Sequence, residues 1–475
     1  MRVLLLCCLF LVPIIFQAQE VTVSGDISLR DKEAYDIVGR VDDAIILFNH
    51  EGKEQSISIY NENLVLQSER QINLIGKRPR IYEVLNLDTA FAVIYGYHDK
   101  KEEVIQLDIF SATAELLDSI PIASRTEDWT GLDFESVFSE DGSFLSLYQL
   151  QGNNELHVMT YDLSEDSLYR NFEYKFGDVN LYDVFLDAQI SNKGDFYMLM
   201  EINNSKSQRD KHEALIYHFP LNTEAIQQIV IPLREIVCAD LVLAIDNRNG
   251  KVGVGGLYDE KRKSESEGFF WIAEKEKAYD NLNVSFFPFN EELLFEVYGN
   301  RKEKRLDDFA IADVIWKKDG SPILVFEMQV DVSRRTSNGF GGSVNSRTAV
   351  NSWSDHYRED LILISLNLKN EVEWHRVFYK RQFSQNDGAI FSSFYSFLTP
   401  QRLRLIYNDE IKTNSTVSEY ILDPLGNYKR TSVLSTEYQN LRLRFADAEQ
   451  ISSTELLIPS QKNYTLNMVK IDFGI

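Results

Sequence analysis

The chain has 475 residues, of which 44% are hydrophobic and 26% charged, and its 49 basic and 73 acidic side chains give a net charge of −24. This balance is typical of a folded globular protein and excludes a disordered acidic tail. It also excludes a basic nucleic-acid-binding protein, which needs a surplus of Lys and Arg to neutralise phosphates. Three cysteines in so long a chain exclude a disulfide scaffold.

The first 18 residues have the pattern of a secretory signal peptide. Arg2 precedes an apolar run from Val3 to Phe16, and the small residue Ala18 suits cleavage. The run is shorter than the ~20 residues that span a bilayer, and no later stretch is long and apolar enough to do so. Cleavage removes Arg2, which changes the net charge from −24 to −25, and leaves Cys238 as the one cysteine. We therefore expect an exported protein of the periplasm, cell surface or extracellular space, without a transmembrane segment after cleavage, in which Cys238 is a buried thiol.

The rest of the chain, residues 19–475, consists of short apolar runs of the strand type. These runs are rich in Val, Ile, Leu, Phe and Tyr and alternate with turns such as Ser139–Gly142, Asn192–Gly194 and Lys317–Gly320. When four strands are assigned to each unit, the units begin with inner strands near residues 35–41, 80–87, 132–139, 183–191, 238–246, 307–316, 390–398 and 442–451. A repeat of this kind predicts the four-stranded blades of a β-propeller.

The two ends of the chain predict how the ring closes. The last unit, from Leu441 to Phe473, contains only three strands, whereas residues 20–29 form one strand too many. If the N-terminal strand completes the last blade as its outer strand, no sheet edge is left open. We therefore predict a single all-β domain over residues 19–475, a propeller of eight blades with seven as the alternative count. A chain of separate β-sandwiches is the other alternative, but no Pro/Gly/Ser-rich linker divides the sequence.

Five groups of residues between Gly250 and Asp423 carry a resemblance to a known family. They are Gly255-Gly256-Leu-Tyr258 with Gly268-Phe-Phe270, Asp319-Gly320 with Glu327, Asp360-Leu-Ile-Leu-Ile-Ser365, Glu373-Trp374 with Lys380 and Gln382, and Tyr407-Asn408-Asp409. In these residues the chain resembles uncharacterised secreted β-propeller-like proteins of Bacteroidota-type bacteria. The resemblance implies the fold and export, and it implies no catalytic residue.

Recognisable motifs for cofactors, metals or nucleophiles are missing from the sequence. The seven histidines show no metal-ligand spacing and no cysteine partner, so the closest pair, His212 and His218, are expected to be surface residues. No Gly-x-Ser-x-Gly elbow is present, and no helix follows the glycine-rich run Gly253–Gly256, which is expected to relieve crowding between blades. We therefore expect no cofactor and no metal ion.

Acidic residues near the starts of the inner strands are the remaining constellation with catalytic potential. A ring of carboxylates at one mouth of the channel could hold a cation, or could raise the pKa of one member enough for general acid catalysis. Alternatively, they accept backbone N–H bonds at the beginning of each strand, because their distance to the following turn varies. The residues are Asp36, Asp133, Asp183, Asp240, Asp307 and Asp447.

One face of the predicted propeller receives nearly every insertion. The hairpins between second and third strands are elongated in three consecutive blades, at residues 205–212, 259–267 and 331–359, and the last is predicted to be a long loop insertion. These loops are rich in Lys and Arg, and the longest adds aromatic residues of the kind that dominate interface energetics. The binding residues expected on this face are Lys77, Arg78, Arg301, Arg305, Arg334, Arg335, Phe340, Arg347, Trp353 and Tyr357.

Two classes of function follow from these observations. The first is an exported, non-enzymatic binding or scaffold propeller that recognises a cell-envelope protein or polysaccharide through its looped face. The second is a secreted hydrolase or lyase that acts at the propeller mouth through the channel carboxylates. The missing nucleophile, metal and cofactor motifs favour the first. Aspartates that converge in a deep pocket would favour the enzyme, whereas aspartates in blade-to-blade hydrogen bonds would disfavour it.

Overall fold

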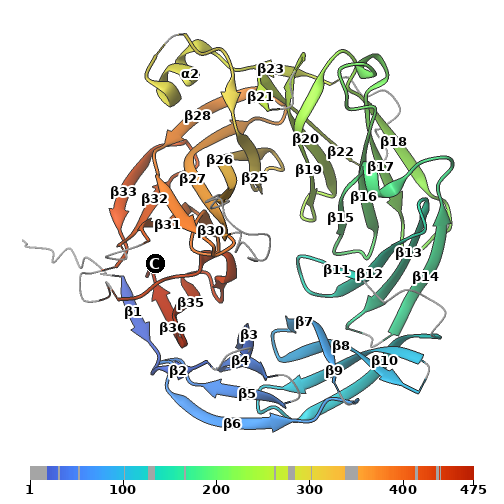
Figure 1. The fold of residues 1–475 in the computed structure, drawn as a ribbon, viewed down its shortest axis with the longest axis vertical. Helices are drawn as coiled ribbons and strands as arrows, with labels where there is room; N and C mark the ends of the chain where they lie inside the picture. Colours follow the sequence, from blue (N-terminus) through green and yellow to red (C-terminus); the bar gives the residue numbers. More distant parts are fainter. Residues whose placement is uncertain are drawn as a thin grey trace, which may run out of the picture.

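The computed structural model describes residues 19–29, 33–51, 54–76, 78–100, 102–126, 134–164, 167–261, 264–275, 284–300, 302–336, 351–411, 416–434, 438 and 440–474. Within them the chain forms eight antiparallel blades around a common axis, as Figure 1 shows. The prediction of an eight-bladed propeller is confirmed. The expected signal peptide, residues 1–18, lies outside the described part of the chain. Among the described helices, none is long and apolar enough to cross a membrane.

The first four blades follow one another along the chain. Their strands are β3 (Glu33–Val41), β4 (Ala44–Glu51), β5 (Glu54–Tyr60) and β6 (Leu66–Ile72) in blade one; β7 (Arg80–Asn86), β8 (Ala90–Asp99), β9 (Glu102–Ser111) and β10 (Leu116–Thr126) in blade two; β11 (Glu135–Phe138), β12 (Phe144–Gln151), β13 (Glu155–Asp162) and β14 (Ser167–Lys175) in blade three; and β15 (Phe185–Ile190), β16 (Phe196–Ile202), β17 (Glu213–Phe219) and β18 (Gln227–Pro232) in blade four.

The last four blades carry the irregular additions. Their strands are β19 (Val237–Asp246), β20 (Lys251–Asp259), β22 (Gly268–Lys275) and β23 (Phe286–Pro288) in blade five; β25 (Phe309–Trp316), β26 (Pro322–Thr336), β27 (Asn351–Leu366) and β28 (Val372–Phe378) in blade six; β30 (Phe394–Leu398), β31 (Leu403–Glu410), β32 (Thr416–Leu422) and β33 (Tyr428–Ser432) in blade seven; and β34 (Glu449–Gln450), β35 (Glu455–Lys462), β36 (Thr465–Asp472) and β1 (Glu20–Val23) in blade eight. Short elements outside the blades are β2 (Ile27–Ser28), β21 (Glu265–Ser266), β24 (Leu306–Asp307), β29 (Gln382–Gln385), the helices α1 (Leu181–Val184) and α2 (Glu291–Tyr298), and the 3-10 helices η1 (Arg209–Lys211) and η4 (Phe445–Asp447).

The N-terminal strand closes the ring. β1 pairs antiparallel with β36, from Glu20 opposite Asp472 to Val23 opposite Val469, and β2 pairs with the beginning of the same strand. The outer strand of blade eight therefore comes from the other end of the chain, as the sequence predicted. An outer position for β1 leaves no edge of β36 exposed to another chain.

The core lies between neighbouring blades. On β8, six consecutive residues from Ala90 to Tyr95 are buried, because both faces of the blade are covered. Phe91 and Val93 pack toward Phe48 of blade one, whereas alternate residues pack toward blade three. Outer strands such as β6 are mostly exposed and polar. Burial thus decreases from the middle of each blade toward its rim.

Glycines in β20 make room for a large side chain of the same blade. A Cβ at Gly253 would lie 2.4 Å from the Trp271 ring, and one at Gly255 would lie 2.6 Å from it. Trp316 of blade six packs edge-on against Trp271, with ring centroids 5.5 Å apart. The glycine-rich run therefore serves packing within and between blades.

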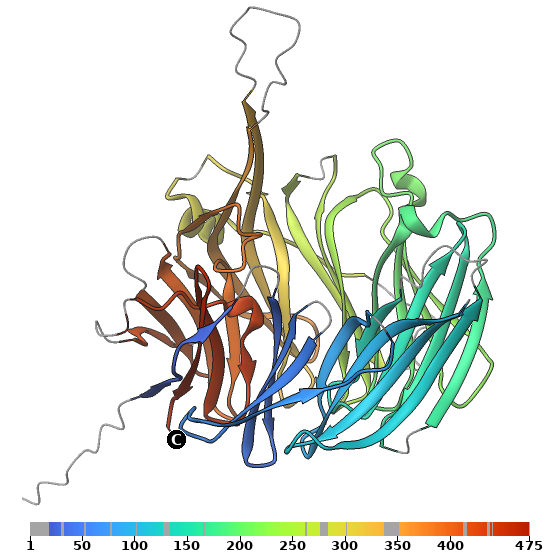
Figure 2. The same cartoon turned by 60° about the horizontal axis from the view of Figure 1, so that its bottom comes forward.

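A two-stranded arm projects from blade six, as Figure 2 shows. The arm consists of the ends of β26 and β27, which pair from Gln329 opposite Arg358 to Thr336 opposite Asn351. The sequence predicted a loop over residues 331–359, but residues 331–336 and 351–359 are strand. The polar side chains in this segment obscured the alternation of a strand, and pairing in the ladder satisfies the backbone groups that a loop would expose. Residues 337–350 lie outside the described part of the chain.

Candidate functional site

The aspartates predicted to ring the channel lie on different kinds of element. Asp36 and Asp240 lie on the inner strands β3 and β19, whereas Asp183 belongs to α1, Asp307 to β24 and Asp447 to η4; Asp133 lies outside the described residues. Local partners hold two of them, because Asn180 donates to Asp183 at 2.6 Å and Arg444 pairs with Asp447 at 2.5 Å. The five described aspartates therefore do not share one structural position.

A different set of carboxylates does occupy a repeated position. Five inner strands, β3, β7, β15, β19 and β25, contain a β-bulge at which the register shifts by one residue. The residue after the bulge is acidic in four of them: Glu83, Asp187, Asp240 and Asp313. In β3 it is Gly39, where a Cβ would lie 2.6 Å from the carboxylate of Glu449 in blade eight. A β-bulge bends the strand and changes the direction in which the neighbouring side chains point.

Burial raises the pKa of each of these five carboxyl groups. Desolvation is the largest cause for Glu83, Asp187, Asp240 and Asp313. The effect is strongest for Glu449, whose pKa burial raises to about 8. Glu449 lines a cavity of about 780 Å³ between blades one, two, three and eight. This carboxyl group is therefore largely protonated at neutral pH.

Two of the repeated carboxylates accept a hydrogen bond from a neighbouring blade, and a third is linked to one through Gln189. The Ser136 hydroxyl of blade three donates to Glu83 Oε2 of blade two at 3.3 Å, and the Ile311 backbone N–H of blade six donates to Asp240 Oδ2 of blade five at 2.7 Å. In blade four, Gln189 Nε2 donates both to Asp187 and to the Leu243 carbonyl oxygen of blade five. Carboxylates that bond to neighbouring blades are the arrangement that disfavours catalysis at the propeller mouth. The acidic residues after the bulges lie in a shared sequence pattern, apolar-x-acid-apolar, as in Ile81–Val84 and Ile311–Val314. This pattern is the signal by which the sequence could have identified them.

The structure places the predicted binding residues in different surroundings. Lys77, Arg301, Phe340 and Arg347 lie outside the described residues, and the backbones of Arg334, Arg335 and Trp353 are on the arm strands. Arg78 is exposed. Arg305 is enclosed by acidic residues: its Nε lies 2.5 Å from Asp259 Oδ2, and Glu265 and Glu267 also pair with it. The positive charge of Arg305 is thus neutralised by residues of the chain itself.

Side-chain contacts hold the base of the arm in one geometry. Arg358 donates through two nitrogens to the carboxylate of Asp331 at 2.9 and 3.2 Å, and His356 Nδ1 lies 2.7 Å from the same carboxylate. The Arg358 hydrogen bond, together with His356, lowers the pKa of Asp331. The Tyr357 ring packs on Phe383 of β29, with centroids 5.0 Å apart, and β29 pairs with β27 from Asp355 to Arg358.

A buried polar network lies directly below the arm. Lys380 Nζ is 2.6 Å from Glu327 Oε1, and both side chains are fully buried. Lys380 also donates to Gln382 Oε1 at 2.9 Å, and Gln382 Nε2 donates to the Asn408 carbonyl oxygen at 2.8 Å. The second oxygen of Glu327 accepts from Ser393 at 2.9 Å. Four residues that carry the family resemblance, Glu327, Lys380, Gln382 and Asn408, thus meet in one network that joins blades six and seven.

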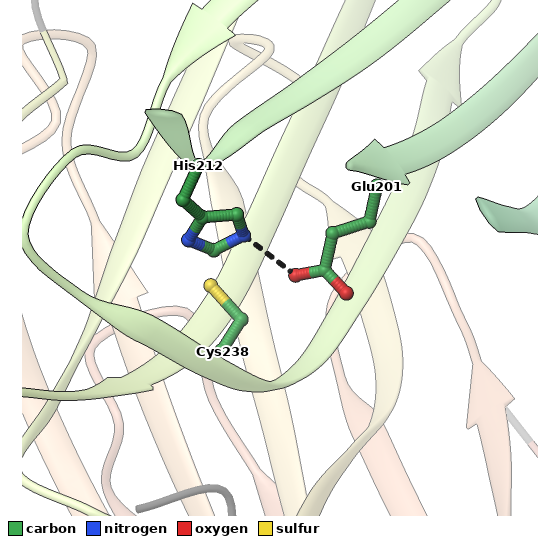
Figure 3. A group of neighbouring side chains, drawn as sticks. All are labelled: Glu201, His212 and Cys238. Carbon is green, nitrogen blue, oxygen red and sulfur yellow. Dashed lines mark hydrogen bonds and ion pairs between the residues drawn. The ribbon is translucent and has the colours of Figure 1, made fainter. Parts of the chain in front are cut away.

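Glu201, His212 and Cys238 form the group of potential metal ligands in the described residues. Cys238 is 2% exposed and forms no disulfide, which confirms the expected buried thiol. The expectation of surface histidines is wrong for both members of the pair: His212 is fully buried and lies beside Cys238, as Figure 3 shows, and His218 is 3% exposed. The three residues come from separate strands and loops, so no sequence spacing relates them.

Comparisons with known proteins concern the fold alone. No protein-family model matches the chain, and no curated protein matches it in sequence. Among solved structures, the chain is similar to one of two prolyl endopeptidases, with a TM-score of 0.38 and 11% identity over 83% of this chain. The chain spans 47% of the length of that protein. It is also similar to the dihydro-heme d1 dehydrogenase NirN, with a TM-score of 0.44 and 10% identity over 92% of this chain and 75% of that one. A third similarity is to the β-propeller domain of Nup133 from Vanderwaltozyma polyspora, with a TM-score of 0.40 and 8% identity over 95% of this chain and 99% of that one.

Proposed function

We propose that this protein is an exported, non-enzymatic binding propeller that recognises a cell-envelope protein or polysaccharide through the face that carries the β26–β27 arm. The observation that supports this function is the arm itself, which leaves the disc as a paired ladder. A recognition element that is ordered before it binds loses less conformational entropy on association than a flexible loop does.

The supports of the arm are consistent with a rigid platform. The bidentate Arg358–Asp331 pair holds β27 against β26, and the Tyr357–Phe383 contact holds β27 against β29. Below them, the buried Lys380–Glu327 pair anchors the chain on both sides of the arm. These contacts restrict rotation of the arm relative to the blade, so a partner would meet a fixed surface.

The hydrogen-bonding edge of the arm favours a protein partner with an extended segment. In the described residues, β26 pairs with β25 as far as Met328, and from Val330 to Thr336 it pairs with β27 alone. Its other edge therefore presents unpaired backbone N–H and C=O groups. Such an edge accepts an added strand from a partner, whose side chains then provide specificity.

The hydrolase or lyase alternative has less support. Glu83 and Asp240 are engaged in hydrogen bonds with neighbouring blades, and the predicted aspartates lie on different elements. We therefore assign the acidic inner positions to blade assembly.

The test is removal of the arm. A variant in which residues 333–355 are replaced by a short Gly-Ser turn is compared with the wild type for crosslinked partners in the native cell envelope, identified by mass spectrometry. A matched control replaces Asn222–Ala225, a turn on the opposite face, in the same way. We expect the wild type and the control to capture the same partner and the arm variant to lose it, at equal melting temperatures. Unchanged capture by the arm variant would contradict the proposal.

A further inference from the structure

Three potential metal ligands converge below the elongated hairpin of blade four. Glu201 lies near the end of β16, His212 lies between η1 and β17, and Cys238 lies on β19, the inner strand of blade five. One ligand atom from each residue lies within 4.8 Å of the others. The His212 side chain is fully buried, and the Glu201 side chain is 12% exposed. The site therefore bridges two blades and has limited access to water.

Hydrogen bonds from outside the group orient each ligand. His212 Nδ1 lies 2.9 Å from the Ile236 carbonyl oxygen, so that Nε2 points toward Glu201 (Figure 3). Asn204 Nδ2 donates to Glu201 Oε2 at 2.7 Å, which leaves Oε1 directed at His212. The Asn204 amide also bonds the backbone of Cys238 in both directions, at 3.0 and 3.1 Å. Bonds of this kind fix ligand geometry and tautomer around protein-bound metal ions.

Hydrogen bonding alone leaves one acceptor beside a neutral His212 unsatisfied, and only the imidazolium form donates to both. His212 Nδ1 faces a carbonyl oxygen, and Nε2 faces Glu201 Oε1 at 3.0 Å, so both ring nitrogens point at acceptors. A neutral imidazole carries one N–H and satisfies only one of them. The same arrangement excludes a Cys-His-Glu nucleophilic triad, because neither ring nitrogen is left to take the proton of the Cys238 thiol. A cation between Nε2 and Oε1 would satisfy both atoms.

We propose that Glu201 Oε1, His212 Nε2 and Cys238 Sγ bind one divalent transition metal ion, with Zn²⁺ as the ion that suits these donors. Thiolate, imidazole and carboxylate are the ligands that Zn²⁺ takes in proteins, whereas Mg²⁺ and Ca²⁺ require a shell of oxygens. The charges of the carboxylate and the thiolate cancel that of the dication, so the buried site is neutral overall.

Binding of a metal ion requires the Glu201 and Cys238 side chains to move slightly closer to His212. Zinc bonds of about 2.0–2.3 Å in a tetrahedral site place ligand atoms roughly 3.3–3.8 Å apart. Atoms within 4.8 Å of one another reach this spacing through rotation of the Glu201 and Cys238 side chains. Three protein ligands leave the fourth position to a water molecule. The ion would join the blade-four hairpin to β19 and so stabilise the face that carries the arm, independently of any partner.

The test uses the full mature chain after treatment with a chelator. Titration with Co²⁺ is expected to saturate at one equivalent per chain and to produce a thiolate-to-cobalt charge-transfer absorption that Zn²⁺ then removes. Zn²⁺ is also expected to raise the melting temperature. The wild-type spectrum tests the thiolate ligand without any variant, so a wild type that binds no Co²⁺, or binds it without this absorption, overturns the proposal.

Two variants locate the site. Cys238→Ser keeps the size of the side chain and should lose the charge-transfer absorption and weaken Zn²⁺ binding by more than about tenfold. His218→Gln is the matched control, because His218 lies in the same blade, stacks on Tyr197 and faces Asp195 at 3.7 Å. This control should retain the absorption and the stoichiometry. An absorption that survives in Cys238→Ser, or that is lost in His218→Gln at unchanged folding, contradicts the assignment.

Discussion

The buried carboxyl group of Glu449 makes a specific prediction about stability and pH. Glu449 lies on β34 with its carboxylate over Gly39, and burial raises its pKa to about 8 from an ordinary 4.5. The substitution Glu449→Gln keeps the shape of the side chain and removes the charge. A comparison of this variant with the wild type therefore isolates the cost of ionising one buried group.

The sign and magnitude follow from proton linkage. The native state binds this proton more tightly than the unfolded chain, so the stabilisation is fully present below the unfolded pKa and is lost as pH rises through the native pKa. A difference of 8 − 4.5 = 3.5 pH units corresponds to a total of about 5 kcal/mol, of which about 3 kcal/mol is lost between pH ~4 and pH ~7. The variant should therefore gain stability relative to the wild type by about 3 kcal/mol over this range.

The assay is urea unfolding of both proteins at a series of pH values. Glu455→Gln, on the neighbouring strand β35, is a control of opposite sign. Although burial acts to raise the pKa of Glu455, the hydrogen bond from Lys470 and the charge of Arg40 lower it below its ordinary value. Its stabilisation is present above the unfolded pKa and is lost as pH falls, so Glu455→Gln should be least stable, relative to the wild type, at neutral pH. Parallel stability curves for the wild type and Glu449→Gln would refute the reasoning.

Three further changes test the packing of the propeller. Lys380→Met leaves the buried Glu327 carboxylate without its partner 2.6 Å away, and we expect urea unfolding to show a loss of about 3–5 kcal/mol; a loss below about 1 kcal/mol would contradict a charged pair. Gly39→Ala introduces a Cβ 2.6 Å from the Glu449 carboxylate at a φ of +88°, so the melting temperature should fall, and an unchanged value would contradict the close approach. Deletion of residues 19–28 exposes the edge of β36 and should cause association in size-exclusion chromatography, whereas a monodisperse monomer would show that closure is not needed.

The contacts of the buried Lys380 network could not be predicted from the sequence. Lys380 and Gln382 are among the residues that carry the family resemblance, but only the structure brings them into contact with Glu327 and Asn408. The bulged inner strands are a second case. Their acidic residues were present in a repeated local pattern, yet the residue that fills the space above Gly39 comes from blade eight, at the other end of the chain.

The sequence by itself determined the repeat of four-stranded blades and the closure by the N-terminal strand, and it favoured eight blades over seven. These properties depend on local alternation, on turn residues and on the count of strands, all of which can be read along the chain. Only the tertiary structure showed that Arg305 is neutralised by acidic residues from another segment of the chain. It also decided that residues 331–336 and 351–359 are strand and that Glu201, His212 and Cys238 meet. Such contacts join residues tens of positions apart, and their geometry depends on how the blades pack against one another.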